Sequence, residues 1–210
     1  MRRILLVDDH EVVRKGLMKV LTEAFQPVEV EEAGNGQEAV SKVLKSRYDL
    51  VVLDIKMPGK SGLDALKEIK HHQPRLPVLI LSMYPEDQLA VRAMRAGASG
   101  YLTKESASDE LVLAIRKALN GEKYISGSLA QILAGELDKD PEKPPHEILS
   151  DREYQVMVMI ASGKPVGAIA RELCLSVKTI SSYRANILLK MGMKNNAEIT
   201  HYAIQNKLVD

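Results

Sequence analysis

Residues 50–59 read Leu-Val-Val-Leu-Asp-Ile-Lys-Met-Pro-Gly, and this stretch decides the fold. The apolar run over residues 50–53 is typical of a strand buried on both faces, and the Met-Pro-Gly sequence after it predicts a turn. Asp54 would therefore lie at the carboxyl end of an internal strand. Ligands of open α/β sheets bind at the carboxyl ends of the strands, so Asp54 is the first candidate for chemistry.

Similar runs recur through the first 120 residues and alternate with amphipathic stretches, as parallel strands and crossover helices do. We predict an α/β fold with a doubly wound, five-stranded parallel sheet whose strands are buried on both faces. The predicted strands span residues 4–7, 28–32, 50–53, 78–81 and 100–102. The predicted helices span residues 11–24, 37–45, 62–71, 85–96 and 108–120.

A second, smaller domain is predicted after a linker. Another amphipathic stretch, residues 126–137, is followed by a segment rich in prolines and charges at residues 138–145, which suits an exposed linker. Residues 149–207 then show helical periodicity without a convincing strand, which predicts a small all-helical domain. The predicted organisation is a first domain over residues 1–121, a linker with a helix over 122–146 and a helical domain over 147–210.

The composition is that of an ordinary soluble protein, with 45% hydrophobic and 27% charged residues among 210. No apolar run approaches the ~20 residues needed to cross a bilayer, and the short run after Met1 is interrupted by Asp8, so we expect neither a membrane span nor a signal peptide. The single cysteine, Cys174, lies between two leucines and is expected to be a buried thiol in a reducing cytoplasm.

Three acidic residues should meet at one edge of the predicted sheet. Asp8 and Asp9 follow the first strand, and Asp54 follows the third. Like charges at close range repel unless a cation lies among them, and ligation by oxygen alone favours Mg²⁺ over zinc. The alternative for Asp8 and Asp9 is capping of the next helix, but capping does not explain Asp54.

Two further residues follow strands at the same edge. Lys104 comes after the fifth strand and could offset negative charge on a transferring phosphoryl group, while Ser82 after the fourth could donate a hydrogen bond to it. A carboxylate beside a metal can attack phosphorus to give an acyl phosphate. Taken singly, the lysine is more often a solvated charge and the serine a turn residue, but their joint placement favours chemistry.

These residues, with Met57-Pro58-Gly59 and the sequence Tyr-Leu-Thr-Lys at 101–104, resemble the receiver domain of two-component response regulators over residues 1–121. The resemblance implies that Asp54 accepts phosphate from a sensor histidine kinase. It also implies that Asp8, Asp9, Asp54 and the backbone carbonyl of Lys56 organise magnesium. Ser82 and Lys104 would follow the phosphoryl group, and Tyr101 would rotate on switching. Glu105 stands where many receivers have proline.

Three other classes of protein could share parts of this sequence pattern. A flavodoxin-like cofactor binder would share the fold, but Asp8 and Asp9 would repel a flavin phosphate. A phosphatase with an aspartyl intermediate would need a positioned general acid, and none is identifiable, so we expect no enzyme. A protein-binding adaptor would keep the receiver and use the helical domain for docking.

The helical domain has the spacing of a helix-turn-helix. A first helix opens at Ser150 or Asp151, a second begins near Pro165, and a third runs from Ser176 towards Met191. The third helix should turn Ile180, Tyr183, Ile187 and Met191 inward. Its opposite face carries Lys178, Ser181, Ser182, Ala185 and Leu189, mostly short side chains that permit close approach to groove edges.

The net charge of +1 hides a local basic excess. Residues 164–194 carry six basic side chains and Glu172 as the single acid. Among them, Lys178, Arg184, Lys190 and Lys194 could neutralise DNA phosphates. A solvated structural helix could carry similar residues, so the charge excess is what favours DNA.

This domain resembles the LuxR-type helix-turn-helix of NarL/FixJ-class regulators over residues 147–208, through Leu-Ser-Asp-Arg-Glu at 149–153, Lys-Thr-Ile at 178–180 and Asn-Ala-Glu at 196–198. The resemblance implies that Ser181, Ser182 and Ala185 face the groove and that Lys178 and Thr179 contact the backbone. It further implies promoter DNA, RNA polymerase and a homodimer formed on phosphorylation. The last helix, over 197–208, would serve as core or dimer surface.

Overall fold

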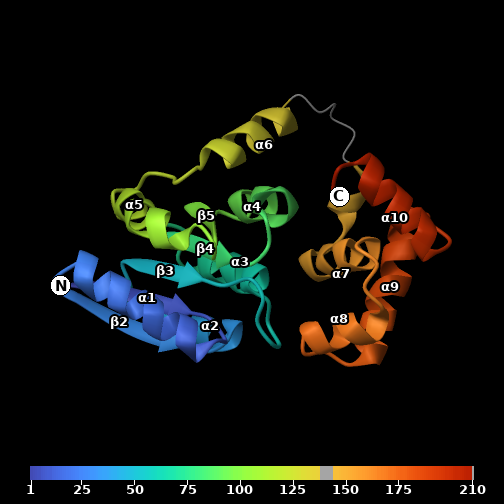
Figure 1. The fold of residues 1–210 in the computed structure, drawn as a ribbon. Coiled ribbons are helices and arrows are strands. Elements are labelled where there is room, and N and C mark those ends of the chain that lie inside the picture. The colour runs from blue at the N-terminus through green and yellow to red at the C-terminus, as the bar shows by residue number, and fades with distance from the viewer. Residues whose placement is uncertain (138–143, 210) are drawn as a thin grey trace. The chain divides into compact units, whose positions relative to one another are not determined.

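The computed structural model describes residues 1–137 and 144–209, and Figure 1 shows their helices and strands. Contacts divide the chain into two compact units, Met1–Leu133 and Ala134–Asp210. The segment predicted as an exposed linker falls mainly on residues 138–143, which lie outside the described residues.

The first unit alternates strands and helices as predicted, and the element ends differ from the expected ones by at most two residues. Its elements are β1 (Arg2–Val7), α1 (Glu11–Ala24), β2 (Val28–Ala33), α2 (Gly36–Lys45), β3 (Leu50–Leu53), α3 (Gly62–His72), β4 (Val78–Ser82), α4 (Glu86–Arg95), β5 (Gly100–Thr103) and α5 (Ala107–Leu119). The next helix, α6 (Gly127–Leu137), begins in the first unit and ends in the second.

All five strands are parallel, in the order β2-β1-β3-β4-β5, which is the doubly wound sheet that the sequence predicted. Leu6 on β1 pairs with Val52 on β3, so these strands lie inside the sheet. The expectation that every strand is buried on both faces is wrong for β2. This strand forms an edge of the sheet, and its alternating valines and glutamates leave residues 28–32 only partly buried.

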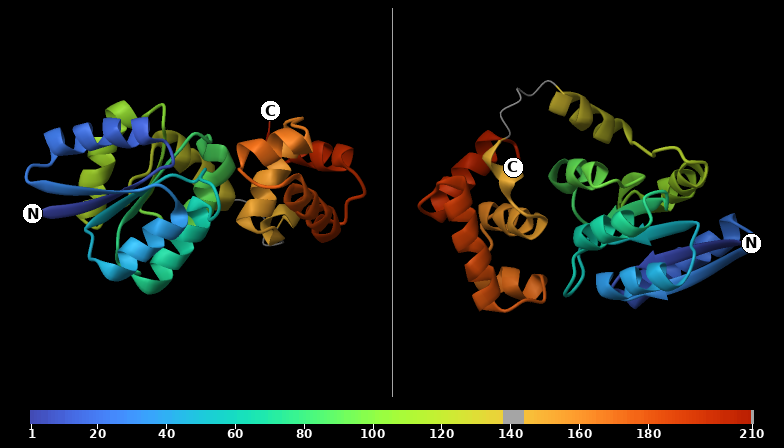
Figure 2. Two further views of the ribbon diagram at one scale, coloured as in Figure 1. Left: turned by 90° about the horizontal axis from the view of Figure 1, so that it is seen from below. Right: turned by 180° about the vertical axis from the view of Figure 1, so that it is seen from behind.

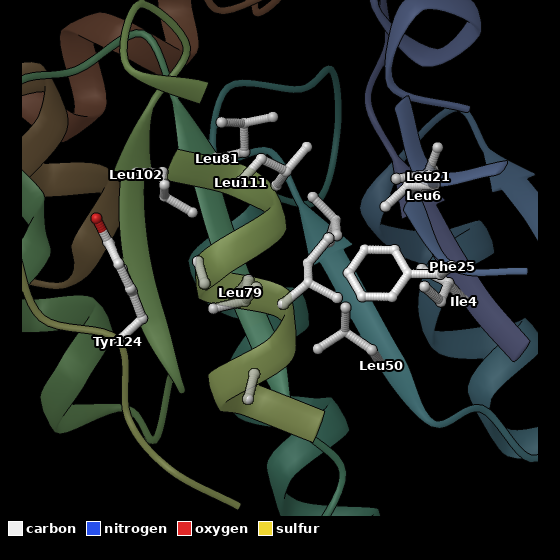
Figure 3. Packing of buried hydrophobic residues seen from close by; sticks show 14 residues of the cluster. Ile4, Leu6, Leu21, Phe25, Leu50, Leu79, Leu81, Leu102, Leu111 and Tyr124 are labelled. Carbon is white, nitrogen blue, oxygen red and sulfur yellow. The ribbon is translucent and has the colours of Figure 1, made fainter. Parts of the chain in front are cut away.

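The main apolar core of this unit lies between the sheet and the helices α1 and α5. Figure 2 shows these two helices on one face of the sheet and α2 and α3 on the other. Leu21 and Phe25, from the end of α1, belong to one apolar cluster with Leu111 of α5 and with strand residues such as Leu50 and Leu79, and Figure 3 shows this cluster. Burial of such side chains contributes about 2 kcal/mol each. The core thus fixes the strand ends that carry the candidate site.

The second unit is helical throughout its described residues. It contains the 3₁₀ turn η1 (Pro145–Ile148), followed by α7 (Asp151–Ala161), α8 (Val166–Glu172), α9 (Val177–Met191) and α10 (Asn196–Gln205). The fully buried side chains Ile169, Ile180, Ile187 and Ile199 come from α8, α9 and α10. This confirms the predicted helical domain with a helix-turn-helix.

Side-chain caps set the ends of these helices. Ser150 caps α7 in a capping box with Glu153, and the Ser176 hydroxyl caps α9 by accepting from the backbone N–H of Thr179 at 3.0 Å. Gly192 ends α9 with a φ of 67°, a left-handed conformation that favours glycine. α10 ends three residues earlier than predicted, since Lys207 has a φ of 53° and cannot continue the helix.

Within the described residues, no helix has both the length and the apolar character that crossing a lipid bilayer requires.

Candidate functional site

The carboxyl ends of three parallel strands carry Asp8 (β1), Asp54 (β3) and Lys104 (β5) at one edge of the sheet. Each follows the last residue of its strand, and each backbone N–H continues the sheet ladder. The N–H of Asp54 donates to Val7 O at 2.8 Å, and the N–H of Lys104 donates to Ser82 O at 2.8 Å. In the sequence, Asp54 is 46 positions from Asp8 and 50 positions from Lys104. The sheet brings all three residues to one edge, as the strand pattern predicted.

The side chains at this edge form a tight charged cluster. The Nζ of Lys104 lies 2.6 Å from Asp8 Oδ2 and donates a hydrogen bond to Asp54 Oδ2 at 2.7 Å. Both carboxylates are only 2% exposed. Burial raises the pKa of Asp54 above its ordinary value, although Lys104 opposes that effect. Burial alone would lower the pKa of Lys104, but Asp54 and Asp8 raise it, so the ammonium is charged at neutral pH.

The loop after β3 holds Asp54 from the other side. The backbone N–H of Lys56 donates to Asp54 Oδ1 at 3.2 Å. Gly62, the first residue of α3, packs so closely that a Cβ atom there would lie 1.9 Å from the carbonyl oxygen of Asp54. Glycine is therefore required at this position, and the beginning of α3 fixes the backbone of the candidate phosphoacceptor.

His10 joins the acidic cluster, and the sequence analysis missed it. Its Nδ1 lies 2.8 Å from Asp9 Oδ1 and 3.1 Å from Asp8 Oδ1. One ligand atom from each of Asp8, Asp9, His10 and Asp54 lies within 4.8 Å of the others. The one clue in the sequence was that His10 directly follows the two aspartates. The capping alternative is not supported, because the N-cap of α1 is His10 and makes no side-chain cap.

Ser82 and Tyr101 lie on β4 and β5, beside the cluster. Both are fully buried. The Ser82 hydroxyl accepts a hydrogen bond from the N–H of Tyr84 at 3.1 Å, and the Tyr101 hydroxyl donates to Tyr84 O at 2.8 Å. Burial raises the pKa of Tyr101 well above its ordinary value, so this hydroxyl keeps its proton. Both residues therefore hold the loop between β4 and α4.

The outward face of α9 matches the sequence expectation. Ile180, Ile187 and Met191 are buried and Tyr183 is partly buried, whereas Lys178, Ser181, Ser182, Ala185 and Leu189 are exposed. The hydroxyls of Ser181 and Ser182 donate back to Val177 O and Lys178 O, at 2.9 and 3.1 Å. Thr179 Oγ1 lies 2.8 Å from the capping hydroxyl of Ser176, so Thr179 also helps to begin the helix.

The four predicted phosphate-binding cations differ in their surroundings. Lys178 and Lys194 are exposed. Arg184 Nε donates to Asn196 Oδ1 at 2.6 Å, and Lys190 Nζ lies 2.6 Å from Glu153 Oε2 of the capping box. Lys190 thus ties α9 to α7.

Cys174 was expected to be buried, and this is wrong. It is exposed and has a φ of 52° in the turn between α8 and α9, where the backbone turns away from the core.

Comparison with known protein families decides the classification. Residues 4–116 match the family "Response regulator receiver domain", and residues 147–203 match "Bacterial regulatory proteins, luxR family". The chain belongs to the response regulators. Receiver and LuxR-type parts in this order make it a DNA-binding transcription regulator of the NarL/FixJ class, as the sequence resemblance implied.

Relatives of this response regulator match it over almost its whole length. It is 37% identical over 209 residues to the response regulator UvrY of Escherichia coli K12, covering 99% of this chain and 96% of UvrY. It is 36% identical over 211 residues to GacA of Pseudomonas aeruginosa, covering 100% and 99%. A structure of RcsB from Salmonella enterica serovar Typhimurium, bound to promoter rprA with phosphomimetic BeF₃⁻, is 26% identical with a TM-score of 0.63, covering 96% and 97%.

Receiver domains generally bind Mg²⁺ at an acidic pocket, and the residues of this response regulator fit that ion. The donor set contains three carboxylates. Asp8 Oδ2 is buried, and the ammonium of Lys104 lies 2.6 Å from it. That single ammonium offsets only one of the three carboxylate charges, and carboxylates at close range repel one another unless further positive charge is present. The cluster therefore has the charge and ligand type for a divalent cation.

Proposed function

We propose that Asp54 of this response regulator is the phosphoacceptor and that its phosphorylation by a sensor histidine kinase controls DNA binding. The observation that carries the proposal is the buried Asp54 carboxylate with Lys104 at 2.7 Å and Asp8 beside it. A carboxylate oxygen attacks phosphorus while the bond from phosphorus to the donor's leaving group breaks, which gives an acyl phosphate. Lys104 offsets negative charge on the transferring oxygens.

Asp8, Asp9, Asp54 and the carbonyl oxygen of Lys56 would hold the magnesium ion. When bound, the ion supplies positive charge that draws the phosphoryl oxygens towards Asp54. The chain's own residues do the rest: Lys56 N–H and Lys104 orient the two oxygens of Asp54. Gly62 keeps the backbone of Asp54 in place. We assign the ion to magnesium because the proposed ligands are oxygen atoms, and His10 lies beside these ligands.

The switch would run through Ser82 and Tyr101. Once Asp54 carries phosphate, the Ser82 hydroxyl can donate to a phosphoryl oxygen, and a change of its rotamer towards the phosphate would release the hydrogen bond from Tyr84 N–H and free the loop there. Tyr101, whose hydroxyl donates to Tyr84 O, would then change its rotamer. The result is a population shift between two states of the receiver, and the favoured state promotes dimerisation or frees the DNA-binding face.

Asp54→Asn tests the phosphoacceptor. The chain is incubated with Mg²⁺ and a radiolabelled small-molecule acyl phosphate, and incorporation of acid-stable, base-labile label is measured. The wild type should take up one label per chain and the variant none, because an amide oxygen cannot form the acyl phosphate. Asp49→Asn, on the exposed loop before β3, is the matched control and should label normally. Normal labelling of Asp54→Asn would refute the assignment.

For DNA, we propose that α9 enters the major groove with Ser181, Ser182 and Ala185 at base edges. Lys178, Thr179, Arg184, Lys190 and Lys194 would contact the phosphate backbone. Arg184 would have to exchange its bond to Asn196, and Lys190 its ion pair with Glu153. The exposure of the short side chains on α9 supports this orientation, as does the DNA-bound relative RcsB.

Lys178→Ala tests the phosphate contact. A duplex enriched from a random DNA library by the phosphorylated protein is titrated at several salt concentrations. The variant should bind all sequences more weakly, and the slope of log affinity against log salt should fall by about one. Lys207→Asn removes a positive charge from the same unit and tolerates the left-handed φ, so it is the control. An unchanged slope for Lys178→Ala would exclude the contact.

The remaining assignments belong to the same proposal. The domains are a receiver over residues 1–121, a linker with a helix over 122–146 and the DNA-binding domain over 147–210. The protein would act in the cytoplasm as a homodimer when phosphorylated, would contact RNA polymerase at promoters and would not be an enzyme. Structures of RcsB dimers on DNA support the dimer. Steady turnover of phosphate at catalytic rates would instead favour a phosphatase.

A further inference from the structure

A groove lies at the edge of the receiver sheet opposite to the acidic cluster. It is formed by the beginning of β1, the loops that precede β3 and β4, and the end of α5, and it has a volume of about 850 Å³. None of the residues proposed to take part in phosphorylation or DNA binding lines it. The residues that do include Arg2, Arg47, Tyr48, Arg75, Pro77 and Leu119.

Three arginines around this groove have free guanidinium groups. Arg2, Arg47 and Arg75 are exposed, and in the described part of the chain their side chains form no hydrogen bond or ion pair. Arg3 and Arg14, by contrast, are both paired with glutamates of β2. The acid that lines the groove is Asp49, and its Oδ2 already accepts a hydrogen bond from the N–H of Arg3 at 2.7 Å.

Nearby lysines add to the positive charge. Lys70 Nζ donates to Leu76 O at 2.6 Å and to Pro74 O at 3.4 Å, and both acceptors belong to lining residues. Burial lowers the pKa of Lys70, and the positive charge of Lys123 lowers it further. Positive charges therefore repel one another at this end of the receiver.

An ordinary explanation would be that these arginines compensate the ends of α2, α3 and α5, which lie here. Cations are favourable near carbonyl ends of helices. However, in the described part of the chain none of the three guanidinium groups donates to a carbonyl of these helix ends, whose last backbone hydrogen bonds come from main-chain N–H groups. Ser46 N donates to Lys42 O at 2.9 Å, Gln73 N to Ile69 O at 2.7 Å, and Asn120 N to Arg116 O at 3.2 Å. The guanidinium groups remain without acceptors.

We propose that this groove binds a small organic polyanion with at least two phosphate or carboxylate groups. Guanidinium groups match both of these oxyanions with paired N–H donors. The volume is within the ~300–1,000 Å³ range of small-molecule sites and far larger than one inorganic phosphate requires. Tyr48, Pro77 and Leu119 give the walls apolar surface for the body of the ligand.

The test is calorimetric titration of the full-length protein in low salt without magnesium. The probes are ATP, inorganic pyrophosphate and citrate, which separate a nucleotide, a bare phosphate and a carboxylate as the source of the anion. At least one should bind with a dissociation constant below about 1 mM. Arg47→Gln/Arg75→Gln should weaken that binding about tenfold or more, because two charge-assisted contacts are lost.

A matched control removes two positive charges from α1. Lys15→Gln/Lys19→Gln should leave binding within about twofold of the wild type, since their effect is only long-range and screened. Unfolding temperatures without ligand verify that the variants are folded, and Arg75→Gln alone replaces the double variant if that one is not. Two results would overturn the proposal: no binding of any probe, or equal weakening in the groove and control variants.

Discussion

The Nζ atom of Lys104 lies within 2.7 Å of two buried carboxylates that reach it from different strands. The sequence could predict that these three residues lie close together, because a residue directly after a parallel strand has a defined place at the edge of the sheet. The apolar run before Asp54 and the turn after it were enough to predict that Asp54 lies at the end of a strand. The same reasoning placed Ser82 beside them, whereas Tyr101 was singled out only by the resemblance to receiver domains.

His10 and the pairings of Lys190 could not be predicted in the same way. His10 reaches Asp9 through a loop rotamer that no periodic pattern encodes. Lys190 was assigned to phosphate because it belongs to the local basic excess of residues 164–194, yet its ammonium group lies 2.6 Å from Glu153. Side-chain partners between separate helices depend on tertiary packing.

Glu153 is a residue whose contribution to stability should depend on pH. It accepts from Ser150 N at 2.8 Å and pairs with Lys190. Burial alone would raise the pKa of Glu153, but Lys190 and the Ser150 N–H lower it below its ordinary value. Its stabilisation is therefore fully present above the unfolded pKa of about 4.3 and is lost as the pH falls through the folded pKa.

Glu153→Gln should lower the free energy of unfolding of the second unit by about 1 kcal/mol at pH 7, because the ion pair with Lys190 is lost. The difference from the wild type should shrink below about pH 4 and vanish in stronger acid. Urea unfolding at a series of pH values measures this. A difference that is independent of pH would show that the Glu153 charge contributes nothing.

At the scale of elements, the start of α6 is tethered to the start of α4. Ser126 Oγ donates to Glu86 Oε1 at 2.6 Å, and the Ser128 hydroxyl also donates to Glu86. The same Ser126 oxygen accepts from Leu129 N at 3.0 Å. The helix α6 was predictable from its periodicity, but this tether was not, since it joins polar residues that are 40 positions apart.

Glu86→Ala should loosen the first turn of α6 without unfolding the sheet. The amides of α6 should exchange with deuterium about fivefold faster, as expected when roughly 1 kcal/mol of hydrogen bonding is lost. Exchange followed by mass spectrometry measures this. Glu23→Ala, at the exposed end of α1, should leave α6 unchanged, and identical α6 protection in Glu86→Ala would count against the tether.

Sequence patterns predicted the internal strands well. They predicted the burial of β2 and the end of α10 less well, because both depend on features of the fold that the local sequence does not show. β2 was assigned burial on both faces because its neighbours in sequence have it, but edge position comes from the strand order, which local sequence does not show. The end of α10 depended on the left-handed backbone of Lys207, a non-glycine residue that gives no warning.

At the scale of the whole molecule, the chain contains two units that each have a core of their own. Magnesium ligands are proposed only for the first. Calorimetric unfolding should therefore show two transitions, and Mg²⁺ at about 100 times its dissociation constant should stabilise the receiver transition by about 2.7 kcal/mol. The second transition should not move. In the Asp8→Asn variant, Mg²⁺ should shift neither transition. Equal shifts of both transitions in the wild type would contradict the conclusion that each unit has its own core.

The glutamates of β2 have a consequence for the colloidal behaviour of the protein. Glu29, Glu31 and Glu32 line the free border of the sheet, and Arg3 and Arg14 neutralise them from within the same unit. A foreign strand adding to this border would have to strip water from five charged groups. Amyloid-like growth from this border is thereby discouraged, because each added strand would have to leave these charges without their hydration.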